Sequence, residues 1–360
     1  MAMTTFALND ALAVQRWSAS LATEAEKMQY FRKFMGTDEN AMITVKTDLS
    51  KGAGEKVTYG LLMKLTGDGV EGDNVIEGTS AETALDFYDD GLYIDQRRKG
   101  TKSKGKMSEK RVPYKMREKG RNALATWWAE DYDEQTIMYL SGARGVDTSF
   151  HVALGYTGRA NNSFNSPDSD HVIYGGNATG LSDIDSLDKM DLGLVEKANA
   201  KLETMDPKIR PFRINGENRY VLLMHTWCAY DLRTSISQGD WLEIHKATDG
   251  QKSLIYQNAL GEFGGVILHK HRNVIRFDST TGCASGVTAA RNLLLGAQAG
   301  AVAWGSGGTV GRYSWNEETD DRGNALVITA GAIYGCKGTY YNSKWWGRLA
   351  IDTYNVDPNA

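Results

Sequence analysis

Residues 65–95, LTGDGVEGDNVIEGTSAETALDFYDDGLYID, contain nine acidic side chains and no basic one. The sign of the charge reverses in residues 96–121, QRRKGTKSKGKMSEKRVPYKMREKGR, which contain twelve Lys and Arg and two Glu. Apolar residues are too sparse in these roughly 60 residues to form a core, and an isolated two-stranded excursion is unstable in water. We therefore expect the segment either to stay mobile or to lie on another surface.

The basic segment is an island on an acidic chain. The 360 residues have a formal net charge of −4, so a segment of +10 (twelve minus two) leaves −14 on the rest. A basic run of this density usually contacts phosphates or forms a solvated tail, but the acidic remainder calls for a more particular explanation than general nucleic-acid binding.

Length and composition indicate a globular protein with more than one packed region. Hydrophobic residues make up 41% and charged residues 24% of the chain. No signal peptide is recognisable in MAMTTFALNDALAVQRW, and LLLGAQAGAVAW (293–304) is shorter than the roughly 20 residues of a membrane span. We expect a protein that is soluble, at least before assembly, with no membrane partner.

Three distant cysteines, Cys228, Cys283 and Cys336, predict unpaired thiols and a reducing compartment.

The two charged stretches follow predictable local structure. KVTYGLLMKLTG (56–67) and ETALDFYDDGLYID (82–95) alternate like two half-buried strands that return on each other, with a bulge at Gly91. After Pro113, residues 114–142 predict a helix of about 27 residues, roughly 40 Å long, that Gly142 ends. Its basic beginning and acidic middle oppose the helix dipole, so neighbouring elements must hold it in place.

The rest of the chain mixes helix and strand patterns. We expect strands at 219–226, 264–277 and 345–355, and a long loop at 150–180. Helices are expected at 21–35, at 181–205 with Ser182 or Asp183 as N-cap, and at 287–305, VTAARNLLLGAQAGAVAWG. Because strands and helices do not alternate strictly, the predicted class is α+β.

Motifs for catalysis and metal binding are weak. GDGVEG (67–72) has the spacing of a dinucleotide-binding loop, but no helix follows and its carboxylates would repel a pyrophosphate, so a turn is favoured. His269 and His271 share one face of a strand without a third ligand of local spacing. His225 with Cys228 falls in a strand-like run, so a Cys–His nucleophile is not expected, and the acidic run at 130–134 is better explained as a solvated or ion-paired face of the helix. We expect no catalytic residue, no metal and no cofactor.

Several segments, taken in order, resemble the major capsid protein of tailed bacteriophages, and within that family the branch typified by coliphage N-four. They are residues 46–73, the long helix with its pair Trp127 and Trp128, and residues 219–234, 258–274, 290–305 and 345–355. No single segment is diagnostic. Their collinear succession covers about residues 45–355 and is specific.

The resemblance implies the α+β capsid fold of the Hong-Kong-ninety-seven type. Its parts would be an N-terminal arm at 1–47, an extended loop at 48–113, a peripheral domain at 114–219 with a spine helix at 114–142, an axial domain at 220–335, and a return to the peripheral domain at 336–360. The resemblance also implies a structural protein, not an enzyme. It would self-assemble in the host bacterial cytoplasm into hexamers and pentamers of an icosahedral virion head.

The implied partners are further copies of the chain and portal, scaffolding and decoration proteins. The head would enclose double-stranded DNA without sequence-specific binding. In a ring of identical subunits, an acidic half followed by a basic half lets each copy present both signs to its neighbours. Ten residues are candidate inter-subunit contacts: Asp73, Glu77, Asp89, Asp90, Arg97, Arg98, Lys99, Lys102, Lys104 and Lys106. Reversing Arg97, Arg98 and Lys99 to Glu is then expected to stop assembly and leave the monomer folded.

Two other functions remain open. One is a nucleic-acid-binding protein that uses residues 97–121 as a phosphate clamp. The other is an enzyme whose site includes the strand histidines 269 and 271, which stoichiometric metal in the purified protein would indicate.

Overall fold

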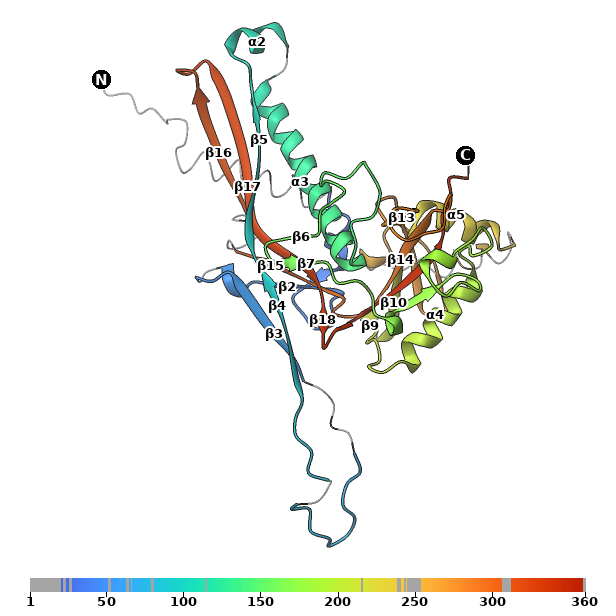
Figure 1. Cartoon of the computed structure of the whole chain (residues 1–360). Coiled ribbons are helices and arrows are strands. Elements are labelled where there is room, and N and C mark those ends of the chain that lie inside the picture. Colours follow the sequence, from blue (N-terminus) through green and yellow to red (C-terminus); the bar gives the residue numbers. More distant parts are fainter. Residues whose placement is uncertain are drawn as a thin grey trace.

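The computed structural model describes residues 21, 24–25, 28–50, 53–62, 65, 67–78, 81–113, 115–214, 216–237, 241–242, 244, 254–305 and 312–358. Within them, two large sheets flank one long helix, α3 (Met116–Ser141), and two projections leave the body in opposite directions (Figure 1). The content of helix and strand is that of the predicted α+β class.

The first sheet, here the long sheet, has six strands and runs beside α3. Its order is β1-β2-β15-β17-β16, and β5 also pairs with β17. The strands are β1 (Met35–Gly36), β2 (Ile43–Lys46), β5 (Asp95–Lys102), β15 (Gly300–Trp304), β16 (Tyr313–Asp320) and β17 (Ala325–Gly338).

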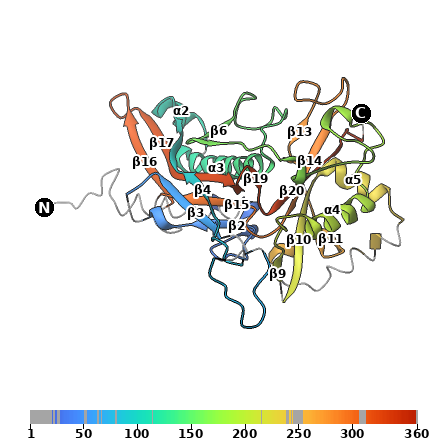
Figure 2. The ribbon, with the colours of Figure 1, turned by 60° about the horizontal axis from the view of Figure 1, so that its bottom comes forward.

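The second sheet, here the broad sheet, has eight strands and is covered on both faces. It comprises β8 (Val172–Tyr174), β9 (Phe212–Ile214), β10 (Glu217–His225), β11 (Ala259–Phe263), β12 (Val266–His271), β13 (Arg276–Phe277), β14 (Ala289–Leu295) and β20 (Arg348–Tyr354). Side chains alternate along β10, so that Val221 and Leu223 join the core with α3, whereas Leu222 and Met224 join the core on the other face. Helices α4 (Leu192–Thr204) and α5 (Thr226–Thr234) lie beside β10 and β11 (Figure 2).

The remaining elements are short or project from the body. Strands β3 (Lys56–Leu62) and β4 (Phe87–Tyr93) form a separate hairpin, and α2 (Lys106–Arg111) lies at the opposite extremity (Figure 1). Two more hairpins join β6 (Gly158–Arg159) to β7 (Asn162–Ser163) and β18 (Tyr340–Tyr341) to β19 (Lys344–Trp345). The 3-10 turns are η1 (Phe31–Phe34), η2 (Asp48–Ser50), η3 (Ser169–His171), η4 (Leu181–Asp183) and η5 (Leu254–Tyr256).

The hairpin and the long helix are confirmed, with one correction. The register of β3 and β4 continues through Thr58 opposite Gly91 without a shift, so the bulge expected at Gly91 is wrong. Helix α3 ends at Gly142, whose φ of 68° is the left-handed conformation that glycine adopts at low cost.

The helix expected at 287–305 is wrong. This stretch forms β14 and β15, joined by a turn in which Gln298 has a φ of 60°. Every residue of β14 is buried because β10 and β20 pair with its two edges and its side chains enter the cores on both faces of the sheet. A continuous apolar run fits a buried helix and a central strand equally well, so its pattern alone could not distinguish them.

Two other expected helices differ in extent. Helix α4 begins at Leu192, not near 182, because the Asp191 carboxylate accepts a hydrogen bond from the Leu194 amide at 2.7 Å and caps it. Around 21–35, residues 21, 24, 25 and 28 are helical and η1 follows; the other positions up to residue 27 lie outside the described residues. The strands expected at 219–226 and 345–355 are confirmed as β10 and β20, and that at 264–277 becomes β12 and β13.

The sheets do not follow the expected domain boundaries at 220 and 335. Strands β15 and β16 and most of β17 lie within 220–335, yet they belong to the sheet that contains β2 and β5 beside α3. Strand β20 and strand β8 lie outside that range, yet they belong to the broad sheet. The chain therefore crosses between the two sheets more often than a division into consecutive ranges implies.

A buried joint connects α3 to the broad sheet. The guanidinium of Arg348 on β20 donates to the Tyr139 carbonyl at 2.7 Å and the Leu140 carbonyl at 2.6 Å. Arg291 on β14 donates to the Ser141 carbonyl at 3.3 Å. Helix α3 has no basic residue in its last turn, so these two arginines supply the positive charge that its carboxyl end lacks.

Arg291 also forms a bidentate ion pair with Asp352, at 2.9 Å from Nε and 2.8 Å from Nη2. Asp352 is fully buried, so Arg291→Met leaves a carboxylate without its partner and is expected to lower the free energy of unfolding by about 3–5 kcal/mol. Chemical denaturation measures the change. The control Lys344→Met breaks the exposed pair with Asp170 and is expected to leave the midpoint unchanged. Equal midpoints for both variants would contradict the buried joint.

Candidate assembly surfaces

The hairpin formed by β3 and β4 is a tongue (residues 56–93) whose outer part has no core. Five large apolar side chains in it face solvent, among them Val75 at 71% exposure and Phe87 at 68%; the others are Leu65, Ile76 and Leu85. The described part of 65–86 contains no strand, and GDGVEG falls within it, so the expectation of a turn at that motif is confirmed. Such a cluster of exposed apolar side chains on an unsupported segment marks a contact surface.

The base of the tongue, by contrast, is anchored to the body. Asp90 is buried, forms an ion pair with Lys337 on β17, and accepts hydrogen bonds from the Tyr59 hydroxyl at 3.0 Å and the Tyr340 amide at 3.2 Å. Asn162 binds both the amide of Tyr93, at 3.0 Å, and its carbonyl, at 2.7 Å. The Asp90 carboxylate is therefore used within the chain, and its contact with another subunit stays a prediction.

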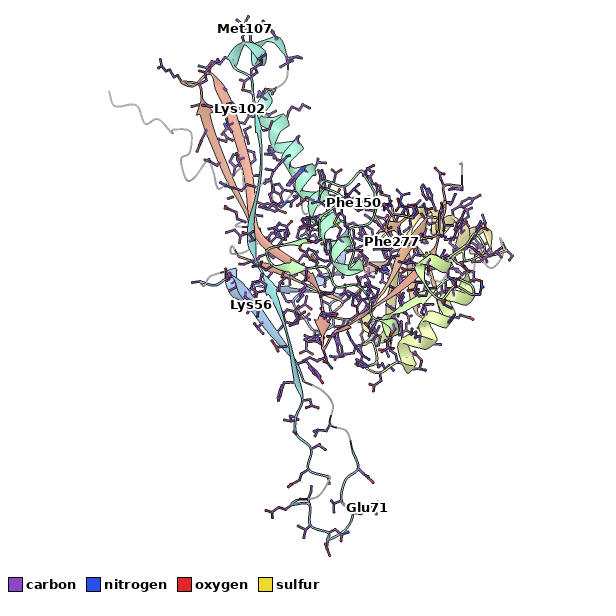
Figure 3. All side chains as sticks on the ribbon, viewed as in Figure 1. Lys56, Glu71, Lys102, Met107, Phe150 and Phe277 are labelled. Atoms are coloured by element: carbon purple, nitrogen blue, oxygen red, sulfur yellow. The ribbon has the colours of Figure 1, made fainter. Side chains whose placement is uncertain are left out.

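The acidic residues further out remain available. Asp73 and Glu77 lie in the outer part of the tongue and Asp89 on β4, and all three are exposed. Figure 3 shows Glu71 at the tip, far from the body. The tongue therefore presents carboxylates and apolar side chains together.

The basic segment is mainly a strand of the long sheet, and its cations divide by face. Residues 95–102 form β5 along β17, so Arg97 and Lys99 face α3 whereas Arg98 faces away. Arg97 donates to the fully buried Asp131 at 2.5 Å, and both Arg97 and Lys99 lie 5.4 Å from the ring of Trp127. The Tyr334 hydroxyl donates to the same carboxylate at 3.1 Å.

Arg97 therefore has a structural role within the chain, and its contact with another subunit stays a prediction. Burial raises the pKa of Asp131, and the Arg97 guanidinium opposes that rise. Reversing Arg97 together with Arg98 and Lys99 would place a second carboxylate beside Asp131, so the triple reversal is expected to unfold this region and cannot leave the monomer intact.

Several other cations of the segment are exposed. Lys102 pairs with Asp320 at the surface, Arg98 is exposed on β5, and Lys104 and Lys106 are exposed at the connection to α2. The same extremity exposes Met107, at 64%, with Val112 and Met116. Lys102 and Met107 lie at the end of the molecule opposite to Glu71 (Figure 3).

The acidic run of α3, residues 130–134, binds several segments of the same chain, which the sequence did not reveal. Asp133 is buried and accepts hydrogen bonds from the amides of Tyr30, at 2.8 Å, and Phe31, at 3.2 Å. Glu134 accepts from the His151 amide at 2.8 Å. Together with Asp131, each carboxylate binds a different segment, so this run organises the fold and is not a solvated face.

The alternative catalytic and metal sites are not supported by their surroundings. Burial lowers the pKa of His269 to about 3 and that of His271 to about 4, and the Ile255 carbonyl lies 2.9 Å from Nε2 of His269. No group of three or more His, Cys, Asp or Glu in the described residues has metal-binding geometry.

All three cysteines are buried free thiols, as predicted, and burial raises the pKa of Cys228. No helix among the described residues has the length and apolarity of a transmembrane segment.

Arg97 and Arg98 form a matched pair for testing the two faces of β5. Arg97→Met leaves Asp131 buried without its ion pair and is expected to lower the free energy of unfolding by about 2–4 kcal/mol. Arg98→Met removes an exposed cation from the next position and is expected to change stability little. Denaturant titration of the two variants measures both; a greater loss for Arg98→Met would refute the assignment of faces.

Asp133 predicts a pH dependence of stability. Burial raises its pKa to about 7 in the folded chain, above the ordinary value of 3.8. The folded state then holds a proton that the unfolded state releases, so this group stabilises most below pH 4 and its contribution is lost as pH rises through about 7. Between pH 5 and pH 8, we expect the free energy of unfolding to fall less for Asp133→Asn than for the unsubstituted chain. Denaturant titration at several pH values measures this, and an equal fall in both proteins would contradict the prediction.

Comparison with known proteins agrees with this geometry. Residues 5–354 match the family described as "Phage capsid protein". The chain is 26% identical over 345 residues to the major capsid protein of Pseudomonas phage KPP25, which covers 89% of this chain and 87% of that protein. It is similar to the capsid of Ralstonia phage GP4, with 40% identity, a TM-score of 0.86 and full coverage of both chains. The cyanophage Pam1 capsid shares the fold, with 19% identity, a TM-score of 0.71 and coverage of 98% and 96%.

Proposed function

The chain belongs to the phage capsid protein family, and on that premise we propose that it assembles head-to-tail into the hexamers and pentamers of an icosahedral head that encloses double-stranded DNA. Membership makes it a structural protein and not an enzyme, and its architecture is the Hong-Kong-ninety-seven-type capsid fold that the resemblance implied. The observation that carries the proposal is the tongue, which exposes five large apolar side chains and has no core in its outer part.

The tongue requires a partner that covers it. At about 25 cal/mol per Å² of apolar surface, covering side chains such as Val75 and Phe87 stabilises a contact by a few kcal/mol. No other part of the same chain covers them in the described residues. A second copy can do so, since a surface at one end of each molecule meets a different surface on the next, and such a contact repeats around a ring.

Charge supports the same arrangement. The tongue carries Asp73, Glu77 and Asp89, whereas Lys104 and Lys106 follow Lys102 at the opposite end of the molecule, and Arg98 lies further back on β5, opposite Gly331. Lys99 and Lys102 lie on the same strand as Arg98 and contact Trp127 and Asp320. Opposite charges at the two ends favour one register of neighbouring copies over others, more than they add affinity. These eight residues, with Asp90 and Arg97, are the proposed inter-subunit contacts, and Asp90 and Arg97 also form ion pairs within the chain.

The parts of the molecule receive names on the same premise. We assign the tongue to the extended loop, α3 to the spine helix, the long sheet with α3 to the peripheral domain, and the broad sheet with α4 and α5 to the axial domain. The finer assignment to the branch typified by coliphage N-four rests on the collinear segments between residues 45 and 355. Portal, scaffolding and decoration proteins are proposed partners, and the host bacterial cytoplasm is the proposed place of assembly.

Replacing Val75 and Phe87 by Ser tests the tongue. Both side chains are exposed in the monomer, so Val75→Ser with Phe87→Ser is expected to leave its unfolding midpoint unchanged and to abolish shells. Electron microscopy and sedimentation velocity of the expressed protein measure the outcome. Leu187→Ser, at a residue with 82% exposure in the loop before α4, is the control and is expected to assemble. Normal shells from the tongue variant would contradict the proposal.

A further inference from the structure

A basic trough lies on the side of the body from which the tongue leaves, where the chain between α4 and β10 meets the turn between β1 and β2. Its sequence is KIRPFRI (208–214), in which basic and apolar residues alternate. Ile209 and Phe212 are buried, whereas Lys208, Arg210 and Arg213 are exposed. The alternation therefore directs the three cations outward while the apolar residues fix the segment to the core.

The backbone of this segment is held firmly. The Tyr220 hydroxyl donates to the Ile209 carbonyl at 3.1 Å, and the Ala297 amide donates to the Arg210 carbonyl at 2.8 Å. The side chain of Asn40 accepts from the Arg213 amide at 2.7 Å and donates to the Arg213 carbonyl at 3.0 Å. The cations thus project from an ordered wall and not from a loose loop.

The trough is a hollow of about 570 Å³ lined by Lys208, Arg210 and Arg213 with Glu39, Asn40, Pro211, Asn218 and Ala297. A second hollow of about 410 Å³ shares Glu39 and Arg210 with it and adds Lys46. Four cations therefore face one carboxylate across the two hollows. Within the part of the chain that the structure describes, Lys208, Arg210 and Arg213 have no ion-pair partner, whereas Arg97, Lys102 and Arg117 of the basic segment each bind a carboxylate.

The lining also indicates the class of ligand. A protein partner is anchored mainly by large apolar and aromatic side chains; none lines the larger hollow among the described residues, whereas Tyr59, Leu61 and Tyr341 line the second. Clustered Lys and Arg without stacking groups, as in the larger hollow, are typical of sequence-independent phosphate contact. We propose that this trough, and not the basic segment 97–121, binds the phosphate backbone of nucleic acid.

The number of contacts limits the strength of binding. At about −0.9 in the slope of log affinity against log salt for each phosphate, four cations give about −3 to −4, or about a 60- to 260-fold loss between 50 and 200 mM salt. Because salt weakens this binding, the contact is reversible, as a wall around packaged DNA requires. The inference extends the proposed function but is tested on free duplex DNA, so it does not depend on whether shells form.

The test compares two triple variants that remove equal charge. The full chain, kept below its assembly concentration, is titrated into a fluorescent 30-base-pair duplex of arbitrary sequence, and anisotropy is followed between 50 and 200 mM salt. Lys208→Gln with Arg210→Gln and Arg213→Gln is expected to reduce the magnitude of the salt slope by about 2.7. Arg98→Gln with Lys104→Gln and Lys106→Gln is expected to keep the slope and affinity of the unsubstituted chain.

Three outcomes overturn the inference. These are the absence of salt-dependent binding by the unsubstituted chain, loss of the slope only in the variant of the basic segment, or binding of a peptide of residues 65–87 in the trough in place of DNA. The single variant Lys208→Gln, which is expected to reduce the magnitude of the slope by about 0.9, replaces the triple variant if thermal unfolding reveals that the latter is misfolded.

Discussion

The carboxyl end of α3 is the joint on which the arrangement of the molecule depends. Three consecutive carbonyls, of Tyr139, Leu140 and Ser141, accept hydrogen bonds from Arg348 and Arg291. Both arginines belong to the broad sheet, whereas the body of α3 packs on the long sheet. One helix end thus fixes two sheets relative to each other, and the helix dipole makes that end favourable for positive charge.

Closer to the middle of α3, three carboxylates bind the segments that surround the helix. Asp131 holds β5 through Arg97, Asp133 holds the chain entering η1 through two amides, and Glu134 holds the loop at His151. Burying three carboxylates is costly unless each has its own donors, and each does. The acidic character that opposes the dipole of the isolated helix is therefore what recruits its neighbours.

The surface of the molecule separates two kinds of contact. The tongue combines apolar and acidic side chains, which suits a protein partner, and the extremity at α2 combines apolar and basic side chains. The trough at 208–213 offers cations without exposed large apolar residues, which suits phosphates. One chain can therefore bind its neighbours and contact its contents through different surfaces, without the basic segment having to do both.

Local pattern in the sequence determined the tongue, α3 with its end at Gly142, the unpaired thiols and the opposite charges of the two segments, because each depends on neighbours within a few residues. The family resemblance came from the order of segments along the chain. Only the tertiary structure decided that 287–305 forms two strands, since β10 and β20 pair with both edges of β14 and the two cores cover its faces. Only it assigned Asp90 to Lys337, 247 residues away, and Arg97 to Asp131. The sequence does not show which way a charged side chain points. The fold decides whether that side chain meets a partner within the chain or is exposed to another molecule.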